Sequence, residues 1–173
     1  MQYRHLWVYH PIEHCYAAAW PRILADTARI LRRTADLGII ICGPDGHGAP
    51  VLDTHRGIAF NGDASGQAEP LRLSAPHRDP HPSPCGTPAP GVGSCQTDRR
   101  PYDVAVAAVL LRCHLLLGDD FRLRSDGAWD LEWAVGVRVG QPSPRHLVAA
   151  LFGATPALSP LHPPPAPATT SPA

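Results

Sequence analysis

Two clusters of proline limit the part of this chain that can fold. Fourteen of its 21 prolines fall within residues 76–101 and 156–172. Proline fixes φ and has no N–H to donate, so neither stretch suits a helix interior or a central strand. We therefore predict one globular domain over residues 1–155, with a long proline-rich loop at 75–100. The proline-rich tail at 156–173 carries no charged residue and is predicted to be disordered.

Helical periodicity is clearest in residues 21–37. Pro21 suits the first helical position, and Gly38 suits the left-handed residue just past a helix end. Apolar side chains recur at the spacing i, i+4, i+7, i+11 of one helix face, at Leu24, Ala28, Leu31 and Ala35. We therefore expect an amphipathic helix over these residues.

Two more helices are predicted in the second half of the chain. Residues 101–117 contain no charged side chain between 104 and 111, and a helix that is apolar nearly all round belongs at the centre of a core. A shorter helix over residues 145–152 is framed by Ser143 as the N-cap and by Gly153 after the last turn.

The predicted strands are short. Three consecutive isoleucines predict a strand over residues 39–42 that is buried on both faces. Residues 57–61, 70–74 and 121–125 predict three more strands, and residues 129–142 stay open between helix and strand. The predicted class is α/β (α+β), with one small, mostly antiparallel sheet packed by two or three helices.

The charge balance restricts the classes of partner. Fifteen basic residues balance fifteen acidic ones, whereas a dedicated nucleic-acid binder needs a basic surface to neutralise phosphates. The N-terminus lacks the pattern of a signal peptide, and no run approaches the ~18–20 apolar residues of a transmembrane helix. We therefore expect a cytoplasmic protein, with no nucleic-acid or membrane partner, whose cysteines are mostly reduced thiols.

Five segments stand out from the rest of the chain: YRHLWVYHP (3–11), CGPDGHG (42–48), RGIAFNGDASG (56–66), RRPYDVAVAAVLLRCH (99–114) and SDGAWDLEW (125–133). Together they resemble a group of uncharacterised proteins from GC-rich actinobacteria, over about residues 3–153. The resemblance implies a folded domain. It implies no activity, cofactor, partner or site residue.

Cys42, Asp45 and His47 are the candidate catalytic residues. A thiol, a carboxylate and an imidazole follow a predicted buried strand, at a place where α/β active sites often lie. A Cys/His pair can form a thiolate–imidazolium nucleophile, and Asp45 would orient the imidazole. The alternative is that Cys42 completes the strand as a small hydrophobic residue and that the other two belong to a turn.

His77, His81, Cys85 and Cys95 are the candidate metal ligands. Imidazole and thiolate groups are the usual ligands of zinc, and a metal ion could order a long loop. Their spacing, H-x3-H-x3-C-x9-C, matches no standard zinc class, and the surrounding prolines stiffen the chain. Chance clustering of histidine and cysteine is therefore the alternative.

Three functions remain open from the sequence. A non-enzymatic accessory or interaction domain, with a protein or small-molecule partner, is favoured because no complete catalytic constellation is present. A small cysteine-dependent enzyme that uses residues 42–48 is the first alternative. A metal-binding module in residues 77–95 is the second. No cofactor is predicted.

Overall fold

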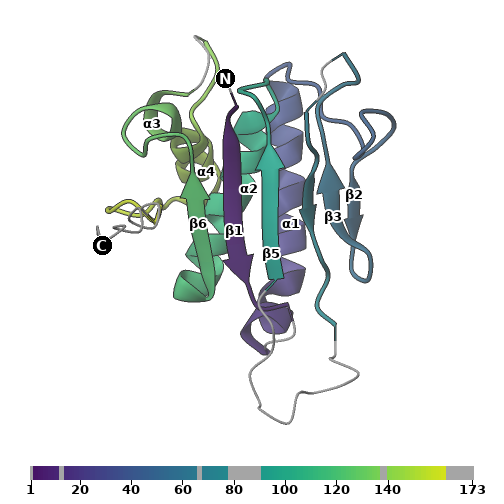
Figure 1. The fold of residues 1–173 in the computed structure, drawn as a ribbon, viewed down its shortest axis with the longest axis vertical. Helices are drawn as coiled ribbons and strands as arrows, with labels where there is room; N and C mark the ends of the chain where they lie inside the picture. The colour runs from purple at the N-terminus through teal and green to yellow at the C-terminus, as the bar shows by residue number, and fades with distance from the viewer. Residues whose placement is uncertain (1, 12–13, 66–67, 78–90, 137–139, 163–173) are drawn as a thin grey trace, which may run out of the picture.

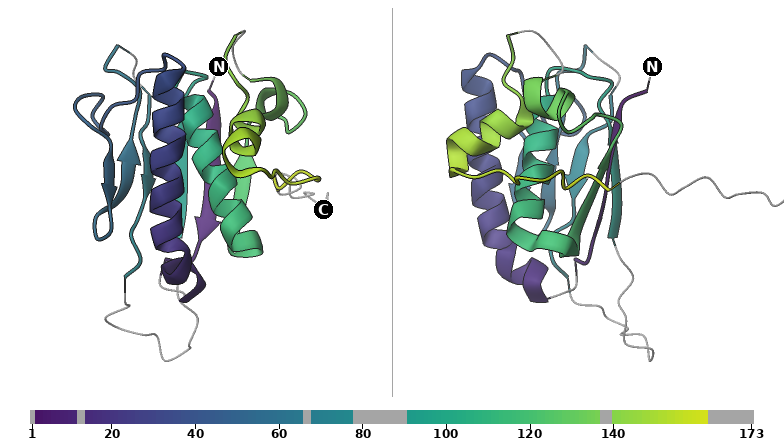
Figure 2. Two further views of the ribbon diagram at one scale, coloured as in Figure 1. Left: turned by 180° about the vertical axis from the view of Figure 1, so that it is seen from behind. Right: turned by 90° about the vertical axis from the view of Figure 1, so that its left-hand side faces the viewer.

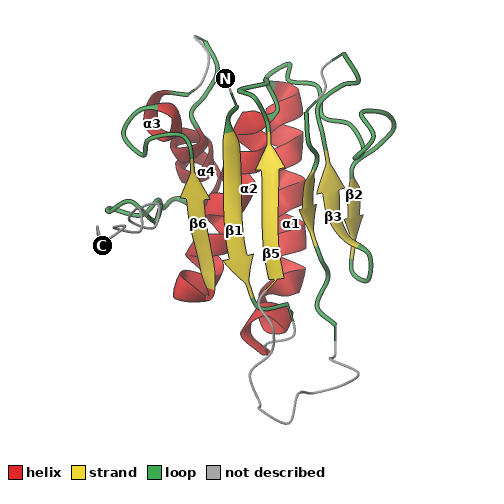
Figure 3. Cartoon of the chain, viewed as in Figure 1, coloured by secondary structure: helices red, strands yellow, loops and turns green. Residues whose placement is uncertain are grey.

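The computed structural model describes residues 2–11, 14–65, 68–77, 91–136 and 140–162. Two three-stranded antiparallel sheets lie next to each other in it, with helices on one side (Figures 1 and 3). The first sheet has the order β5 (Gly91–Gln96), β1 (Arg4–Tyr9), β6 (Phe121–Ser125), and the second has the order β2 (Val51–Asp53), β3 (Gly57–Phe60), β4 (Leu71–Leu73). The α+β class is confirmed, although the strands form two sheets and not one.

The helices α1 (His14–Asp36), α2 (Asp103–Leu117) and α4 (Pro144–Phe152) cover one face of this layer (Figure 2). α2 is the central element, as predicted, because every residue from 103 to 111 is buried. It packs between α1, α4 and strand β6. No helix among the described residues is long and apolar enough to cross a membrane.

The first helix differs from its prediction in both start and orientation. α1 begins at His14, so Pro21 lies inside it. The predicted face is only partly correct: Leu31 is buried and Leu24 and Ala28 are partly buried, but Ala35 is exposed. The other buried residues that face the core include Tyr16, Trp20, Ile23, Thr27, Ile30 and Thr34. The two large aromatic side chains bury more apolar area than the alanines and decide which face turns inward.

Strands β1 and β5 form most of the first sheet, and neither was predicted as a strand. In β1, His5, Trp7 and Tyr9 point to the core, and its other residues are half-buried on the opposite face. β5 lies within the predicted loop at 75–100, of which residues 78–90 are outside the described part. Glycine weakens a strand signal, but Gly93 is needed here, because a Cβ on it would lie 2.2 Å from the Trp7 ring.

The predicted strand at residues 39–42 is wrong. Ile39 is buried, but Ile40 is 61% exposed, and only Cys42 pairs, through an isolated bridge with Asn61. The next strand along the chain is β2, which begins only at Val51. A run of β-branched residues predicts extended backbone, but pairing also needs a neighbouring strand, and none of the described strands pairs with residues 39–41.

The remaining elements agree with their predictions. Strands β3, β4 and β6 lie at the expected positions. α4 begins after Ser143, whose side chain accepts a hydrogen bond from the His146 N–H, and ends at Gly153, which has a φ of 76°. In the open segment, Glu132–Val135 forms the short helix α3, and residues 137–139 are outside the described part.

Glu132 ties α3 to the rest of the fold. Its carboxylate accepts hydrogen bonds from the Ala128 N–H (2.9 Å) and from the Arg99 guanidinium (3.0 Å). Partial burial by itself would raise the pKa of Glu132. The two hydrogen bonds and the nearby positive charge outweigh that effect, so the pKa lies below its ordinary value.

The predicted tail is described as far as His162. Leu161 forms a parallel bridge with Leu123 at the free edge of β6, and the His162 N–H donates to the Leu123 carbonyl (2.8 Å). Residues 163–173 are outside the described part.

A buried ion-pair cluster joins α1 to α2. The carboxylate of Asp26, only 1% exposed, accepts hydrogen bonds from the Nε atoms of Arg22 and Arg112, each at 2.8 Å. Arg29 lies 3.8 Å from the same carboxylate. The guanidinium groups of Arg29 and Arg112 also lie over the Phe152 ring, so the cluster holds α4 as well.

Candidate functional site

The candidate catalytic residues do not form a triad in the structure. Cys42 is partly buried, whereas Asp45 and His47 are exposed, and no hydrogen bond or ion pair joins the three side chains. The backbone around them forms a tight turn, in which the Gly43 N–H donates to the carbonyls of His47 and Gly48. A nucleophile at Cys42 therefore stays a prediction without a geometric partner.

The candidate metal ligands are only partly described. His81 and Cys85 lie outside the described residues. Cys95 is fully buried in β5, and its thiol donates to the Glu69 carbonyl (3.1 Å). Burial raises the pKa of this thiol, which opposes formation of a metal-binding thiolate. The described residues contain no group of three or more potential ligands close enough to hold a metal ion.

A buried histidine–aspartate pair was not visible in the sequence. The His5 Nε2 lies 2.8 Å from Asp103 Oδ1, and the Thr97 hydroxyl donates to the same oxygen. His5 and Thr97 have no exposed surface and Asp103 has only 1%. No substrate can reach this cluster in the folded state, so we interpret it as a structural link between β1, the end of β5 and the start of α2.

The open face of the β5-β1-β6 sheet is the first candidate binding surface. The helices lie behind this sheet, and no described element covers its front (Figures 1 and 2). Antiparallel sheets that face water usually carry polar residues on that side. Here Leu6 and Val8 of β1 and Val92 of β5 form an apolar strip, in which Val92 is 70% exposed and lies opposite Val8.

Two arginines border this apolar strip. Arg122 lies opposite Val8 in the neighbouring strand, and Arg124 lies opposite Leu6. Neither guanidinium forms a hydrogen bond or ion pair with a described residue. With His162 they line a hollow of about 400 Å³ over the strip. We call this surface, made of Leu6, Val8, Val92, Arg122 and Arg124, the open sheet face.

A cavity at the start of α2 is the second candidate site. It has a volume of about 380 Å³, within the range of small-molecule sites. Four chain segments line it: residues 37–40 after α1, residues 62–65 after β3, residues 100–102 before α2, and Gln141 before α4. No prediction from the sequence connected these four segments with one another.

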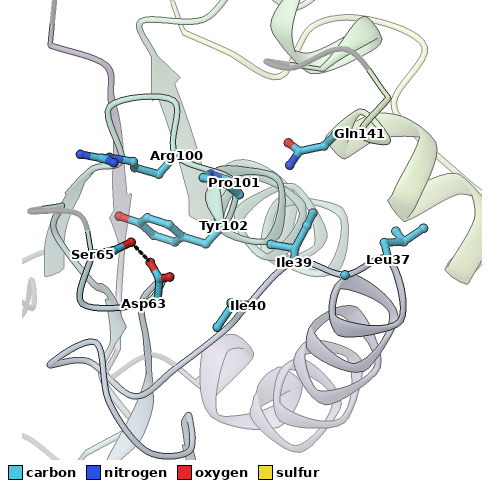
Figure 4. Close-up of a pocket in the computed structure, with 11 residues that line it drawn as sticks. Leu37, Ile39, Ile40, Asp63, Ser65, Arg100, Pro101, Tyr102 and Gln141 are labelled. Atoms are coloured by element: carbon cyan, nitrogen blue, oxygen red, sulfur yellow. Dashed lines mark hydrogen bonds between the residues drawn. The ribbon is translucent and has the colours of Figure 1, made fainter.

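The cavity has a charged side and an apolar side (Figure 4). Pro101 and Tyr102 lie in the middle of the view, with Arg100, Asp63 and Ser65 on one side. Leu37 and Ile39 lie on the other side, and Gln141 directs its amide toward Pro101. Ser65 donates a hydrogen bond to Asp63 (2.7 Å).

Comparison with protein-family models, curated proteins and solved structures finds no match to this chain.

Proposed function

We propose that this protein is a non-enzymatic interaction domain that binds an acidic, amphipathic segment of a partner protein on the open sheet face. The observation that carries the proposal is a pair of arginines without a partner among the described residues, next to an apolar strip that no described element covers. The proposal agrees with the balanced net charge of the chain, because only this local surface, and not the whole protein, needs an acidic partner.

The apolar strip supplies the attraction. Burial of aliphatic surface contributes roughly 25 cal/mol per Å², so a partner that covers Leu6, Val8 and Val92 gains free energy from surface that now faces water. Apolar side chains on the partner are required for this gain. A purely charged partner would leave the strip hydrated.

The two arginines supply the selectivity. Arg122 and Arg124 are two residues apart on one strand, so their side chains project from the same face about 7 Å apart. Guanidinium groups bind carboxylates through paired N–H donors. A partner segment with Asp or Glu beside its apolar residues satisfies both arginines, whereas a basic segment is repelled.

Selection of short random peptides on the immobilised protein tests this function. We expect the enriched peptides to combine acidic with large apolar residues, and the amide NMR signals of β1, β5 and β6 to shift when such a peptide is added. The double variant Arg122→Glu/Arg124→Glu should bind the same peptides at least tenfold more weakly, a loss of about 1.4 kcal/mol.

A matched control uses two other arginines. Arg32 and Arg33 are exposed on α1, on the opposite side of the molecule, and form no ion pair with a described residue. Arg32→Glu/Arg33→Glu makes the same change of net charge and should leave binding unchanged. Enriched peptides without acidic residues, or equal loss in both double variants, would show that the open sheet face is not the docking surface.

Two predictions from the sequence belong to this proposal. One is a cytoplasmic location, which fractionation of the native cells would test. The other is kinship with the actinobacterial group, which rests on the five resembling segments.

A further inference from the structure

We propose that the cavity at the start of α2 is a separate binding site for an aromatic α-amino acid whose ring carries a hydrogen-bond donor, such as tryptophan or tyrosine. The site shares no residue with the open sheet face. The inference rests on three features of the cavity: two opposite charges that do not pair with each other, exposed apolar side chains, and an amide oxygen to which no described residue donates.

The charged side of the cavity suits a zwitterion. The Arg100 guanidinium makes no hydrogen bond or ion pair with a described residue. Among the described residues, only Ser65 donates a side-chain hydrogen bond to the Asp63 carboxylate. Arg100 and Asp63 line the same cavity but do not pair with each other. An α-amino acid carries a carboxylate for Arg100 and an ammonium group for Asp63 on one carbon atom.

The middle of the cavity suits an aromatic ring. Ile40 and Leu37, which are 61% and 40% exposed, contribute aliphatic surface to the cavity. Ile39 and the Pro101 ring lie between the charged side and Gln141 (Figure 4). A ligand ring in this position would cover the exposed aliphatic surface and gain free energy from its burial.

The far side of the cavity suits a hydrogen-bond donor. The Gln141 Oε1 atom is buried, and no described residue donates to it. A buried acceptor without a partner costs about 1–3 kcal/mol. The phenol O–H of tyrosine is a donor at the end of the ring opposite the α-carbon, and the indole N–H of tryptophan is a donor on the edge of its ring. Phenylalanine and aliphatic amino acids lack such a group.

The experiment removes one functional group at a time, first from the ligand and then from the protein. The full chain is titrated with L-tryptophan and with three related compounds, and binding is followed by NMR. Tryptamine lacks the carboxylate, indole-3-propionate lacks the ammonium group, and 1-methyltryptophan lacks the ring donor. L-tyrosine and L-phenylalanine form a second pair. We expect amide shifts around the cavity and at least tenfold weaker binding for each depleted ligand.

Three variants assign each ligand group to its residue. Arg100→Gln should remove the preference for tryptophan over tryptamine. Asp63→Asn should remove the preference for tryptophan over indole-3-propionate, and Gln141→Leu should remove the preference for tryptophan over 1-methyltryptophan. All three residues are exposed or half-buried, so we expect the variants to fold, and thermal unfolding checks this. Arg32→Gln, on the exposed face of α1, is the neutral control and should keep every preference.

The outcomes separate this inference from the proposed function. Arg122→Glu/Arg124→Glu should bind tryptophan like the unaltered protein, because those residues are not part of the cavity. The inference is overturned if neither tryptophan nor tyrosine shifts the cavity signals at about 10 mM. It is also overturned if binding occurs but the three variants keep the preferences of the unaltered protein.

Discussion

Replacement of Asp26 by alanine should destabilise the domain through the charge that it leaves behind. The side chain of Arg112 is only 14% exposed and would lose its carboxylate partner, whereas Arg22 and Arg29 are 58% and 47% exposed and can be hydrated. Breaking a buried ion pair costs about 3–5 kcal/mol, and exposed pairs contribute less than about 1 kcal/mol each. Because Arg112 is partly hydrated, we expect a loss near the lower limit, about 3 kcal/mol.

Equilibrium unfolding in urea, followed by tryptophan fluorescence, measures this loss. A cost of about 3 kcal/mol should lower the Tm by about 6–12 °C for a domain of this size. The double variant Asp26→Ala/Arg112→Met should recover most of the loss. It removes the unpaired charge and keeps an apolar side chain beside the Phe152 ring, which Arg112 now covers.

The reasoning is refuted by either of two results. One is an Asp26→Ala variant that loses less than about 1 kcal/mol, which is the range of a surface pair. The other is a double variant no more stable than the single one. That result would mean that the carboxylate itself, and not the charge left on Arg112, determines the loss.

Three further predictions concern packing, reactivity and pH. Gly93→Ala should cost about 1–3 kcal/mol in urea unfolding, because its Cβ would overlap the Trp7 ring, and an unchanged midpoint would contradict the described strand. Burial raises the pKa of Cys113 to about 12, so iodoacetamide should alkylate this thiol only after unfolding. Cys42 is only partly buried and should react in the native protein, and peptide mass mapping checks both cysteines. The pKa of Glu132 is lowered in the folded state, so its carboxylate stabilises the fold above the ordinary pKa of 4.5, and this stabilisation is lost as pH falls through the lowered pKa. Glu132→Gln should therefore be less stable than the unaltered protein at neutral pH, by under about 1 kcal/mol, and equally stable in acid.

The correct predictions were those that depend on local signals. The charge-free segment before Arg112 predicted a buried helix, because a helix that is apolar on all sides cannot face water anywhere. Ser143 and Gly153 predicted the ends of α4, because a cap acts within one helical turn of its own residue. These features need no knowledge of the rest of the chain.

The wrong or missing predictions depend on contacts between distant residues. β5 contains glycines and followed a proline-rich stretch, so its sequence resembled a loop, and only the Trp7 ring above Gly93 explains why glycine is needed in a strand there. Residues 39–41 carried a strong strand signal but have no paired neighbour among the described strands. Pairing is a tertiary property, and a sequence pattern cannot supply it.

Both proposed sites belong to this second group. The amino-acid sequence by itself determined the apolar central helix, the strands β3, β4 and β6, the ends of α4 and the overall balance of charge. Only the tertiary structure brought Val92 beside Val8, and Asp63 into one cavity with Arg100 and Gln141. The reason is physical: helix periodicity and capping act over a few residues, whereas a binding surface is made wherever the folded chain places distant side chains next to each other.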